Sequence, residues 1–316
     1  MTCFILVSCQ EKKKVEVSVS EGESKTYACP MKCEGEKTYA VAGKCPVCGM
    51  SLEPINGDGI EVLYDMWLTT MPEEPQAGEP VILAFTPKIE GRESEQVPLD
   101  EVHEKKLHVI VVSDDLAWYR HIHPEFQADG SYTIQETFPA GGEYIVFADY
   151  HPTGGANQVE RRTVTIKGTA KKREEFKEAS LTTTTDVYKV TLKPAGGKLL
   201  TNNMNHLGVV VTKNGKAVTD FENIMGAKGH LVIISGDGER YLHVHPEEVD
   251  GKLDMHARFD KPGIYRAFFQ FQTNGTLHTS YFTLNVEEGK EGELETSHGH
   301  DHDHDHDHHE EDHQHN

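Results

Sequence analysis

Three histidines recur at one spacing in two separate parts of the sequence. The segments are "KKLHVIVVSDDLAWYRHIHPE" at residues 105–125 and "AKGHLVIISGDGERYLHVHPE" at residues 227–247. The first carries His108, His121 and His123, and the second carries His230, His243 and His245. The intervals are 13 and then 2 residues in both copies. Because neutral imidazole is the commonest metal-ligating side chain, each copy is a candidate metal site.

Each copy reads as a β-hairpin, with two apolar runs around a short turn. In the second copy, a turn centred on residues 236 and 237 pairs His230 with His243, and one centred on 237 and 238 pairs it with His245. In the first copy, centring the turn on residues 114 and 115 sets His108 against His121. Residues two apart in a strand point the same way. All three imidazoles of a copy are therefore expected on one sheet face, with opposed Cβ atoms about 4.5–5.5 Å apart.

Further possible ligands stand close to each triplet in the sequence. For the second copy they are Met225, Met204 and His206, and for the first copy they are His103 and His151. Imidazoles with a thioether suit copper, in either oxidation state, better than zinc or calcium. The remaining His256 and His278 are expected at the surface.

The chain around the triplets predicts a mainly β fold. Short β-branched and aromatic runs are separated by Gly, Pro, Asn and Asp, and few stretches have a helical period. Two β-sandwich domains are expected, at 60–168 and 181–287, joined by a charged linker at 169–180. The pattern resembles cupredoxin-like or immunoglobulin-like periplasmic domains. Neither repeat contains Cys, so a blue-copper centre, which needs a thiolate, is excluded. The resemblance implies His/Met copper sites that hold and pass on the ion.

Four cysteines form a second metal signal. Cys29, Cys33, Cys45 and Cys48 are spaced C-x3-C-x11-C-x2-C. Two close pairs can place four thiolates around one tetrahedral ion, and metal binding would then supply the folding energy of so small a segment. Two disulfides are the alternative in an oxidising compartment.

This cysteine segment, residues 27–54, contains "YACPM" and "GKCPVCGMSLEP". These resemble the heavy-metal-binding domain at the N-termini of some copper-transporting P-type ATPases and metal-efflux adaptors. That family usually has His-Pro after "CPM", whereas this chain has Lys32 and Cys33. A Cys there keeps the ligand number and makes the site softer, which suits Zn(II) or Cu(I). We call residues 27–54 the cysteine module.

The N-terminus predicts a lipid anchor. "LVSC" ending at Cys9 resembles a bacterial lipobox, so residues 1–9 are expected to be a lipoprotein-type signal with Cys9 as the lipidated residue. The polar residues 10–26 would form a flexible tether. The implied location is the bacterial cell envelope, facing the periplasm or the exterior.

Charge and composition favour cations as ligands. The 316-residue chain has a formal net charge of −21, which argues against nucleic acid as a partner. Nine of its 20 histidines lie in the His/Asp-rich tail. The tail, residues 288–316, has almost nothing apolar to bury and is expected to be disordered. Its imidazoles and carboxylates would collect metal ions weakly.

Together these features predict a membrane-anchored periplasmic protein that binds heavy metal, most consistently copper, for sequestration, transfer or resistance. An efflux system could receive the ion. A zinc or nickel carrier is the alternative within this class. A copper-dependent enzyme is less favoured, because the sequence has no nucleophile elbow, phosphate loop or H-E-x-x-H motif. In a third interpretation the sandwiches are surface interaction modules with incidental histidines.

Overall fold

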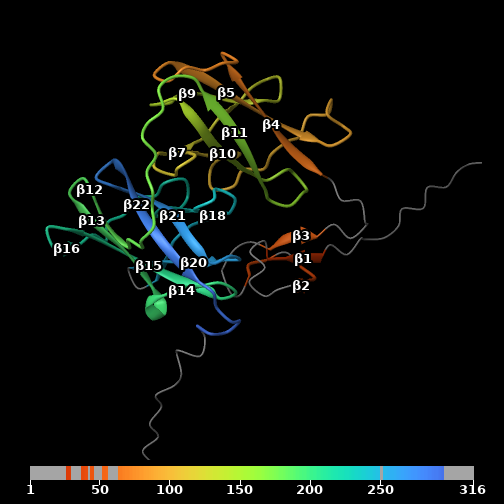
Figure 1. Ribbon diagram of the computed structural model, residues 1–316. Helices are drawn as coiled ribbons and strands as arrows, with labels where there is room; N and C mark the ends of the chain where they lie inside the picture. Colours follow the sequence, from red (N-terminus) through yellow and green to blue (C-terminus); the bar gives the residue numbers. More distant parts are fainter. Residues whose placement is uncertain are drawn as a thin grey trace, which may run out of the picture.

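The computed structural model describes residues 26–29, 37–41, 43–45, 52–55, 63–249 and 252–294. Two β-sandwiches follow one another along the chain, after a small sheet of β1 (Thr26–Ala28), β2 (Thr38–Tyr39) and β3 (Glu53–Ile55) (Figure 1). The predicted mainly β fold with two sandwiches is confirmed. The lipobox and residues 295–316 of the predicted tail lie outside the described residues. No helix in the described part of the chain is long and apolar enough to span a membrane.

The first sandwich has two four-stranded sheets. The outer sheet, in the order β4-β5-β9-β8, consists of β4 (Tyr64–Met71), β5 (Pro80–Ile89), β8 (Glu125–Phe126) and β9 (Tyr132–Thr137). The inner sheet, in the order β11-β10-β6-β7, consists of β6 (Leu107–Ser113), β7 (Tyr119–Ile122), β10 (Gly142–Tyr150) and β11 (Gln158–Ile166).

The second sandwich repeats this plan with additions at its edges. The outer sheet, β12-β13-β15-β20-β19 with β16 beside β15, consists of β12 (Thr182–Thr185), β13 (Tyr188–Pro194), β15 (Met204–Lys213), β16 (Lys216–Ala217), β19 (Glu247–Val249) and β20 (Lys252–Arg258). The inner sheet, β14-β22-β21-β17-β18, consists of β14 (Leu199–Leu200), β17 (His230–Ser235), β18 (Tyr241–Val244), β21 (Gly263–Thr273) and β22 (Thr276–Glu287). A short 3₁₀ turn, Ala195–Gly197, follows β13.

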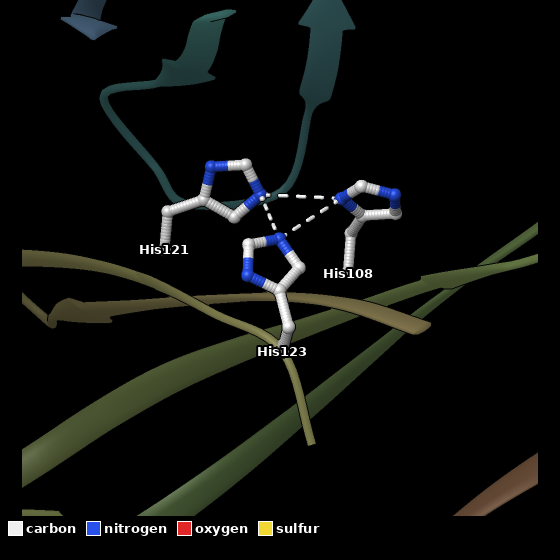
Figure 2. A group of neighbouring side chains, drawn as sticks. All are labelled: His108, His121 and His123. Carbon is white, nitrogen blue, oxygen red and sulfur yellow. Dashed lines mark hydrogen bonds between the residues drawn. The ribbon is translucent and has the colours of Figure 1, made fainter. Parts of the chain in front are cut away.

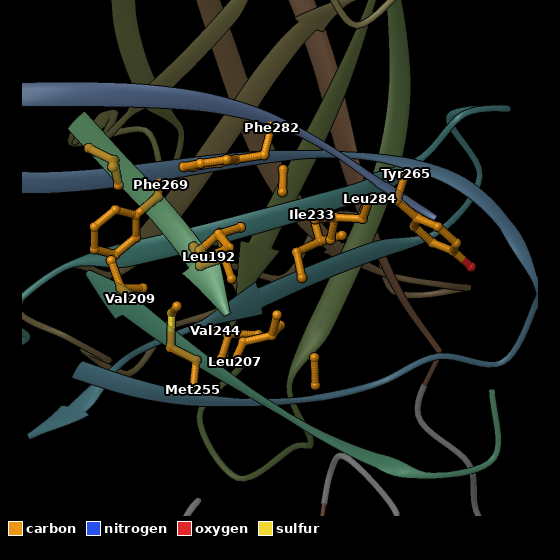
Figure 3. Packing of buried hydrophobic residues seen from close by; sticks show 14 of the residues in the cluster. Leu192, Leu207, Val209, Ile233, Val244, Met255, Tyr265, Phe269, Phe282 and Leu284 are labelled. Atoms are coloured by element: carbon orange, nitrogen blue, oxygen red, sulfur yellow. The ribbon is translucent and has the colours of Figure 1, made fainter. Parts of the chain in front are cut away.

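Each sandwich closes over its own apolar core. Strands β5 and β15 alternate buried and more exposed residues, as half-buried strands do. In the second sandwich, residues such as Leu207, Ile233 and Phe282 interdigitate between the two sheets (Figure 3). Leu83, Val109 and Val146 do the same in the first.

The central strands of the inner sheets are buried on both faces. Strand β6, "LHVIVVS", and strand β17, "HLVIIS", have almost no exposed residue. One face of each strand contacts its own core, and the other contacts the opposite sandwich. A shared cluster that includes Ile110, Val112, Val232 and Ile234 fills the interface. The two sandwiches are therefore packed inner sheet to inner sheet.

This interface has an approximate two-fold relation. Tyr119 on β7 stacks on Phe268 of β21 with ring centroids 4.4 Å apart. Tyr241 on β18 stacks on Phe147 of β10 at 4.9 Å. Each sandwich thus inserts a tyrosine from its hairpin against the phenylalanine of its neighbour. The side chains that follow along the same strands are consequently brought face to face.

The loop of the first hairpin is longer than the sequence predicted. Ile110 pairs with His121 and Val232 pairs with His243, so His108 and His230 stand opposite His123 and His245. Centring the first turn on residues 114 and 115 was therefore wrong, whereas centring the second on 237 and 238 agrees with the structure. Leu116 takes a left-handed φ of 59° and is buried in the interface, which lengthens the first loop. A register shift of two residues leaves every side chain on its original face.

Gly238 offers a test of the packed interface. Its φ is +70°, and an added Cβ would overlap Cδ1 of Ile145 in the other sandwich. We expect Gly238→Ala to lower the free energy of unfolding by about 2–4 kcal/mol, through backbone strain and overpacking. Gly215 is the matched control, because it has φ +76° with nothing within 4 Å. Gly215→Ala should cost only about 1 kcal/mol. Denaturant unfolding measures both, and equal costs would contradict tight packing at Gly238.

Candidate metal centre

The first trio, His108, His121 and His123, converges on one point (Figure 2). The Nε2 atom of His123 lies 3.2 Å from Nδ1 of His108 and 3.2 Å from Nε2 of His121, and the latter two nitrogens are 3.4 Å apart. A tetrahedral ion with metal–nitrogen bonds of about 2.0–2.1 Å sets its ligands about 3.3–3.4 Å apart. The triangle of nitrogens therefore fits one ion.

Hydrogen bonds behind the rings orient the first trio. The Nε2–H of His108 donates to the carbonyl of Val102 at 2.9 Å, and the Nδ1–H of His121 donates to Oε1 of Gln270 at 2.9 Å. With these tautomers, the nitrogens that face each other both carry lone pairs. His123 can donate a proton to only one of them. A cation at the centre of the triangle removes the remaining repulsion, so the local chemistry favours a metal ion there.

The second trio, His230, His243 and His245, repeats this arrangement in its first two rings, whereas His245 approaches them less closely. The Nε2–H of His230 donates to the carbonyl of Ile224 at 2.8 Å, and Nδ1 of His243 lies 3.4 Å from Oδ2 of Asp149. Nδ1 of His230 and Nε2 of His243 are 3.1 Å apart. The His245 ring lies 4.6 Å, centroid to centroid, from both others, and its Nε2 is buried without a hydrogen-bond partner. Such an orphaned nitrogen is suited to ligation.

The two trios meet across the interface. The ring of His121 lies 5.4 Å from that of His230 and 5.2 Å from that of His243, between centroids. His108 and His243 are 5.5 Å apart. These separations resemble the distances between rings within one trio. Six imidazoles from two domains thus form a single cluster.

The sandwiches also exchange the groups that orient these rings. Asp149 of the first sandwich contacts His243 of the second, and Gln270 of the second contacts His121 of the first. Asp149 also accepts a hydrogen bond from Tyr241 at 3.3 Å. A carboxylate behind a ligating imidazole makes that ligand more basic, whereas an amide only orients it. The two halves are therefore alike in geometry and different in charge.

Burial keeps most of these imidazoles uncharged. Removal from water is the main reason that the pKa of His108 falls to about 4 and the pKa of His230 to about 3. Burial and neighbouring His108 lower the pKa of His123 to about 3. The pKa of His121 and the pKa of His245 are also well below 6.5. Protons therefore compete weakly with metal at neutral pH.

The carboxyl of Asp149, unlike the imidazoles, is held in its charged form. Burial favours its neutral form, but hydrogen bonds from His243 and Asn157 outweigh burial and hold the pKa of its carboxyl below the usual value. The cluster consequently contains a negative charge beside the second trio at neutral pH.

Two family models match the chain. The model of a family described as "Domain of unknown function (DUF8832)" matches twice, at residues 62–168 and 182–288. The chain belongs to this DUF8832 family. A model described as "Heavy metal binding domain" matches residues 26–55, which confirms the resemblance of the cysteine module. No curated protein matches the chain. The cupredoxin-like resemblance has no support from these families.

Solved structures resemble the DUF8832 pair only distantly. Fibronectin(III)-like modules of Clostridium thermocellum CbhA are 12% identical, over 72% of this chain and 95% of theirs, with a TM-score of 0.19. A Ca²⁺-stabilised adhesin with which an Antarctic bacterium binds ice is 9% identical, over 72% of this chain and 50% of its own, with a TM-score of 0.23. These scores carry no argument about function.

His103 joins the cluster from the unexpected side. It was predicted beside the first trio, but its ring stacks on His245 of the second DUF8832 domain, 3.8 Å between centroids. The turns at His103 and Met225 have matching left-handed φ angles of 49° and 47°. They also touch, since a Cβ on Gly226 would lie 3.9 Å from Cα of His103. His103 thus reaches across the contact between these turns. Met225 is half-buried in the equivalent turn.

Two other predicted ligands of the second trio lie elsewhere. Met204 and His206 alternate on β15 with buried core residues, so they point outward from the outer sheet. This separation from the trio corrects the prediction that grouped them with it. His206 instead faces His256, 4.3 Å between ring centroids, and Asp254 lies 3.5 Å from its Nδ1. The three form a partly exposed cluster on the outer sheet.

His151 and His278 also have local partners. Nδ1 of His151 lies 3.4 Å from Oδ2 of Asp100. His278, predicted at the surface, is buried against Phe271 and lies 2.6 Å from Asp186 through Nδ1. The hydrogen bond to Asp186 accounts for His278 without a metal ion, whereas the buried Nδ1 of His151 faces Asp100 without forming a hydrogen bond.

The cysteine module is described in part. Cys29 and Cys45 are buried and pack with Leu52. Cys33 and Cys48 lie outside the described residues. The proposed ligand set of this module therefore remains a prediction.

The sequence analysis did not predict the orienting residues Asp149 and Gln270. They occupy equivalent places in the strands "FADYH" and "FFQFQ", two residues beyond the interface phenylalanines Phe147 and Phe268. Alignment of the two repeats matches these two strands with each other. The polar residue within each apolar run was the signal that could have identified Asp149 and Gln270.

Proposed function

We propose that the two DUF8832 domains together bind copper, for sequestration or transfer, and hold the ion where the domains meet. The observation that carries the proposal is the first trio, in which oriented ring nitrogens face one another at the spacing of ligands on one ion. The heavy-metal-binding domain in the same chain supports metal binding as the general function.

The donor set favours copper among the metals that imidazole binds. The first trio offers three convergent imidazole nitrogens, as do His121, His230 and His243 together, and Asp149 is the carboxylate that contacts His243. Burying a doubly charged ion in so weakly charged a site is costly. A monovalent ion reduces that cost, and Cu(I) is the monovalent ion for which three imidazoles form a suitable shell. Zn(II) usually completes a fourth position, so a zinc or nickel carrier is the alternative that metal competition must exclude.

The proposed setting follows from the flanking segments. The lipobox at Cys9 would anchor the chain in a bacterial envelope, and the His/Asp-rich tail and cysteine module would capture ions outside the cell membrane. The buried interface would then retain the ion more tightly. An efflux system is a suitable recipient. Both anchor and recipient are parts of the proposal.

The test uses the full chain and competition with a Cu(I) chelator under anaerobic conditions. The double variant His121→Gln/His243→Gln removes one ligand from each trio. The matched control is His151→Gln, because His151 is paired with Asp100 away from either triangle. We expect the double variant to retain fewer copper ions than the wild type and the control to retain the same number. Equal retention in all three proteins would overturn the proposal, and preferential retention of Zn(II) would reassign the metal.

A further inference from the structure

We propose that the two trios hold two metal ions at the same time, as one coupled pair with a small anion bound between them. The inference rests on the proposed function and adds the number of ions, their interaction and a second ligand. It concerns the cluster as a whole, which neither DUF8832 domain can form alone.

The first argument is proximity. One ligand nitrogen each from His121, His230 and His243 lie within 4.8 Å of one another, although His121 belongs to the first trio. Ring centroids across the interface are only 5.2–5.5 Å apart. With metal–nitrogen bonds of about 2 Å, ions in the two trios would be separated by a distance on the order of 5 Å. Ions so close in a buried site interact strongly.

The second argument is that the shortest printed contacts between ring nitrogens lie within a trio and not across the interface. His108 and His230 each donate a hydrogen bond to a backbone carbonyl of their own domain. Each ring then directs its other nitrogen at a partner 3.1–3.4 Å away within its own trio. The shortest nitrogen contacts are thus within the trios, which favours two ions over one ion shared at the centre.

The third argument is charge. The six imidazoles contribute no negative charge, and Asp149 contributes one beside the second trio. Two cations held this closely repel each other, and one carboxylate does not balance them. An anion between the ions offsets the repulsion and fills an open position on each. Because the rings leave only about 5 Å between the ions, the anion must be of the size of hydroxide, a halide or azide.

The experiment loads the full chain with Cu(II) and removes weakly held ions with a chelator. All proteins carry serine in place of the cysteines of the cysteine module, so that thiols do not reduce Cu(II). The wild-type sandwiches are compared with His121→Gln/His243→Gln and with His123→Gln, which breaks only the first trio. Thermal unfolding without metal confirms that each variant is folded. Ion counting and electron paramagnetic resonance are measured on the same samples, with and without azide.

We expect the wild type to retain two more ions than the double variant, with less than half of the integrated spin signal of two isolated Cu(II) ions. His123→Gln should retain one more ion than the double variant, with its full signal. Azide should change the spectrum of the wild type and not that of His123→Gln.

Two outcomes would overturn the pair while leaving the proposed function standing. One is retention of two ions with full signal, which means independent sites. The other is retention of a single ion by the wild type, which means one shared site. If the wild type retains no more ions than the double variant, both here and in the anaerobic Cu(I) competition, the proposed function itself fails.

Discussion

Copper(I) is expected to raise the unfolding midpoint of the paired DUF8832 domains by about 15 °C or more. A ligand present at a thousand times its dissociation constant adds about 4 kcal/mol of stability per site. Each kcal/mol raises the midpoint by about 2–4 °C in proteins of this size. Because the two trios meet across the interface, unfolding of either sandwich removes one trio and exposes the other to water. Anaerobic calorimetry with and without Cu(I) measures the shift.

The control for this result is the double variant His121→Gln/His243→Gln, melted under the same conditions. It should unfold at nearly the same temperature with and without Cu(I). A shift as large as that of the wild type would place the stabilising ion outside the interface, for example at the cluster of His206, Asp254 and His256. In that case the triad on the outer sheet would become the tight site.

The second large effect is expected at Asp149. Asp149→Asn keeps an oxygen that can accept the hydrogen bond from Nδ1 of His243, but it removes the negative charge. Loss of such an orienting carboxylate typically lowers metal affinity by about 10–100-fold. We therefore expect the second trio to bind copper more weakly by that factor. Titration against a chelator of graded affinity resolves this change.

Gln270 provides the reciprocal variant. Gln270→Glu places a carboxylate behind His121, the equivalent ring of the first trio. Its expected effect is tighter binding at that trio, so that Asp149→Asn combined with Gln270→Glu reverses the order in which the two trios fill. Unchanged affinity in both single variants would show that the groups behind the rings only position them.

Much of this fold could be predicted from the sequence, because the relevant signals are local. Alternating β-branched residues and turn residues indicated the strands, and the His-x-His spacing placed one imidazole in β7 or β18 and a second just after the end of the same strand. The triplets could be recognised for the same reason. The two-residue error at the first hairpin arose because Leu116 adopts a left-handed conformation that its residue type rarely takes.

The joining of the two trios could not be predicted in this way. It depends on which sheet faces pack together, and that is decided by contacts between residues more than a hundred positions apart, such as Tyr119 with Phe268. A signal was present in "HVIVV" and "HLVII", since continuous apolar runs indicate strands buried on both faces. The prediction treated each copy as a separate site and therefore assigned His103 to the wrong trio.

The exchange of Asp149 and Gln270 has a consequence for why the two domains share one chain. A symmetric homodimer of a single DUF8832 domain could build the same six-imidazole shell, because a two-fold interface repeats every contact. Such a dimer would have the carboxylate twice or not at all. Covalent fusion frees the copies from that identity, so one half can carry Asp149 while the other carries Gln270. Tandem duplication thus permits a directional centre, with a stronger and a weaker end, which no homodimer could encode.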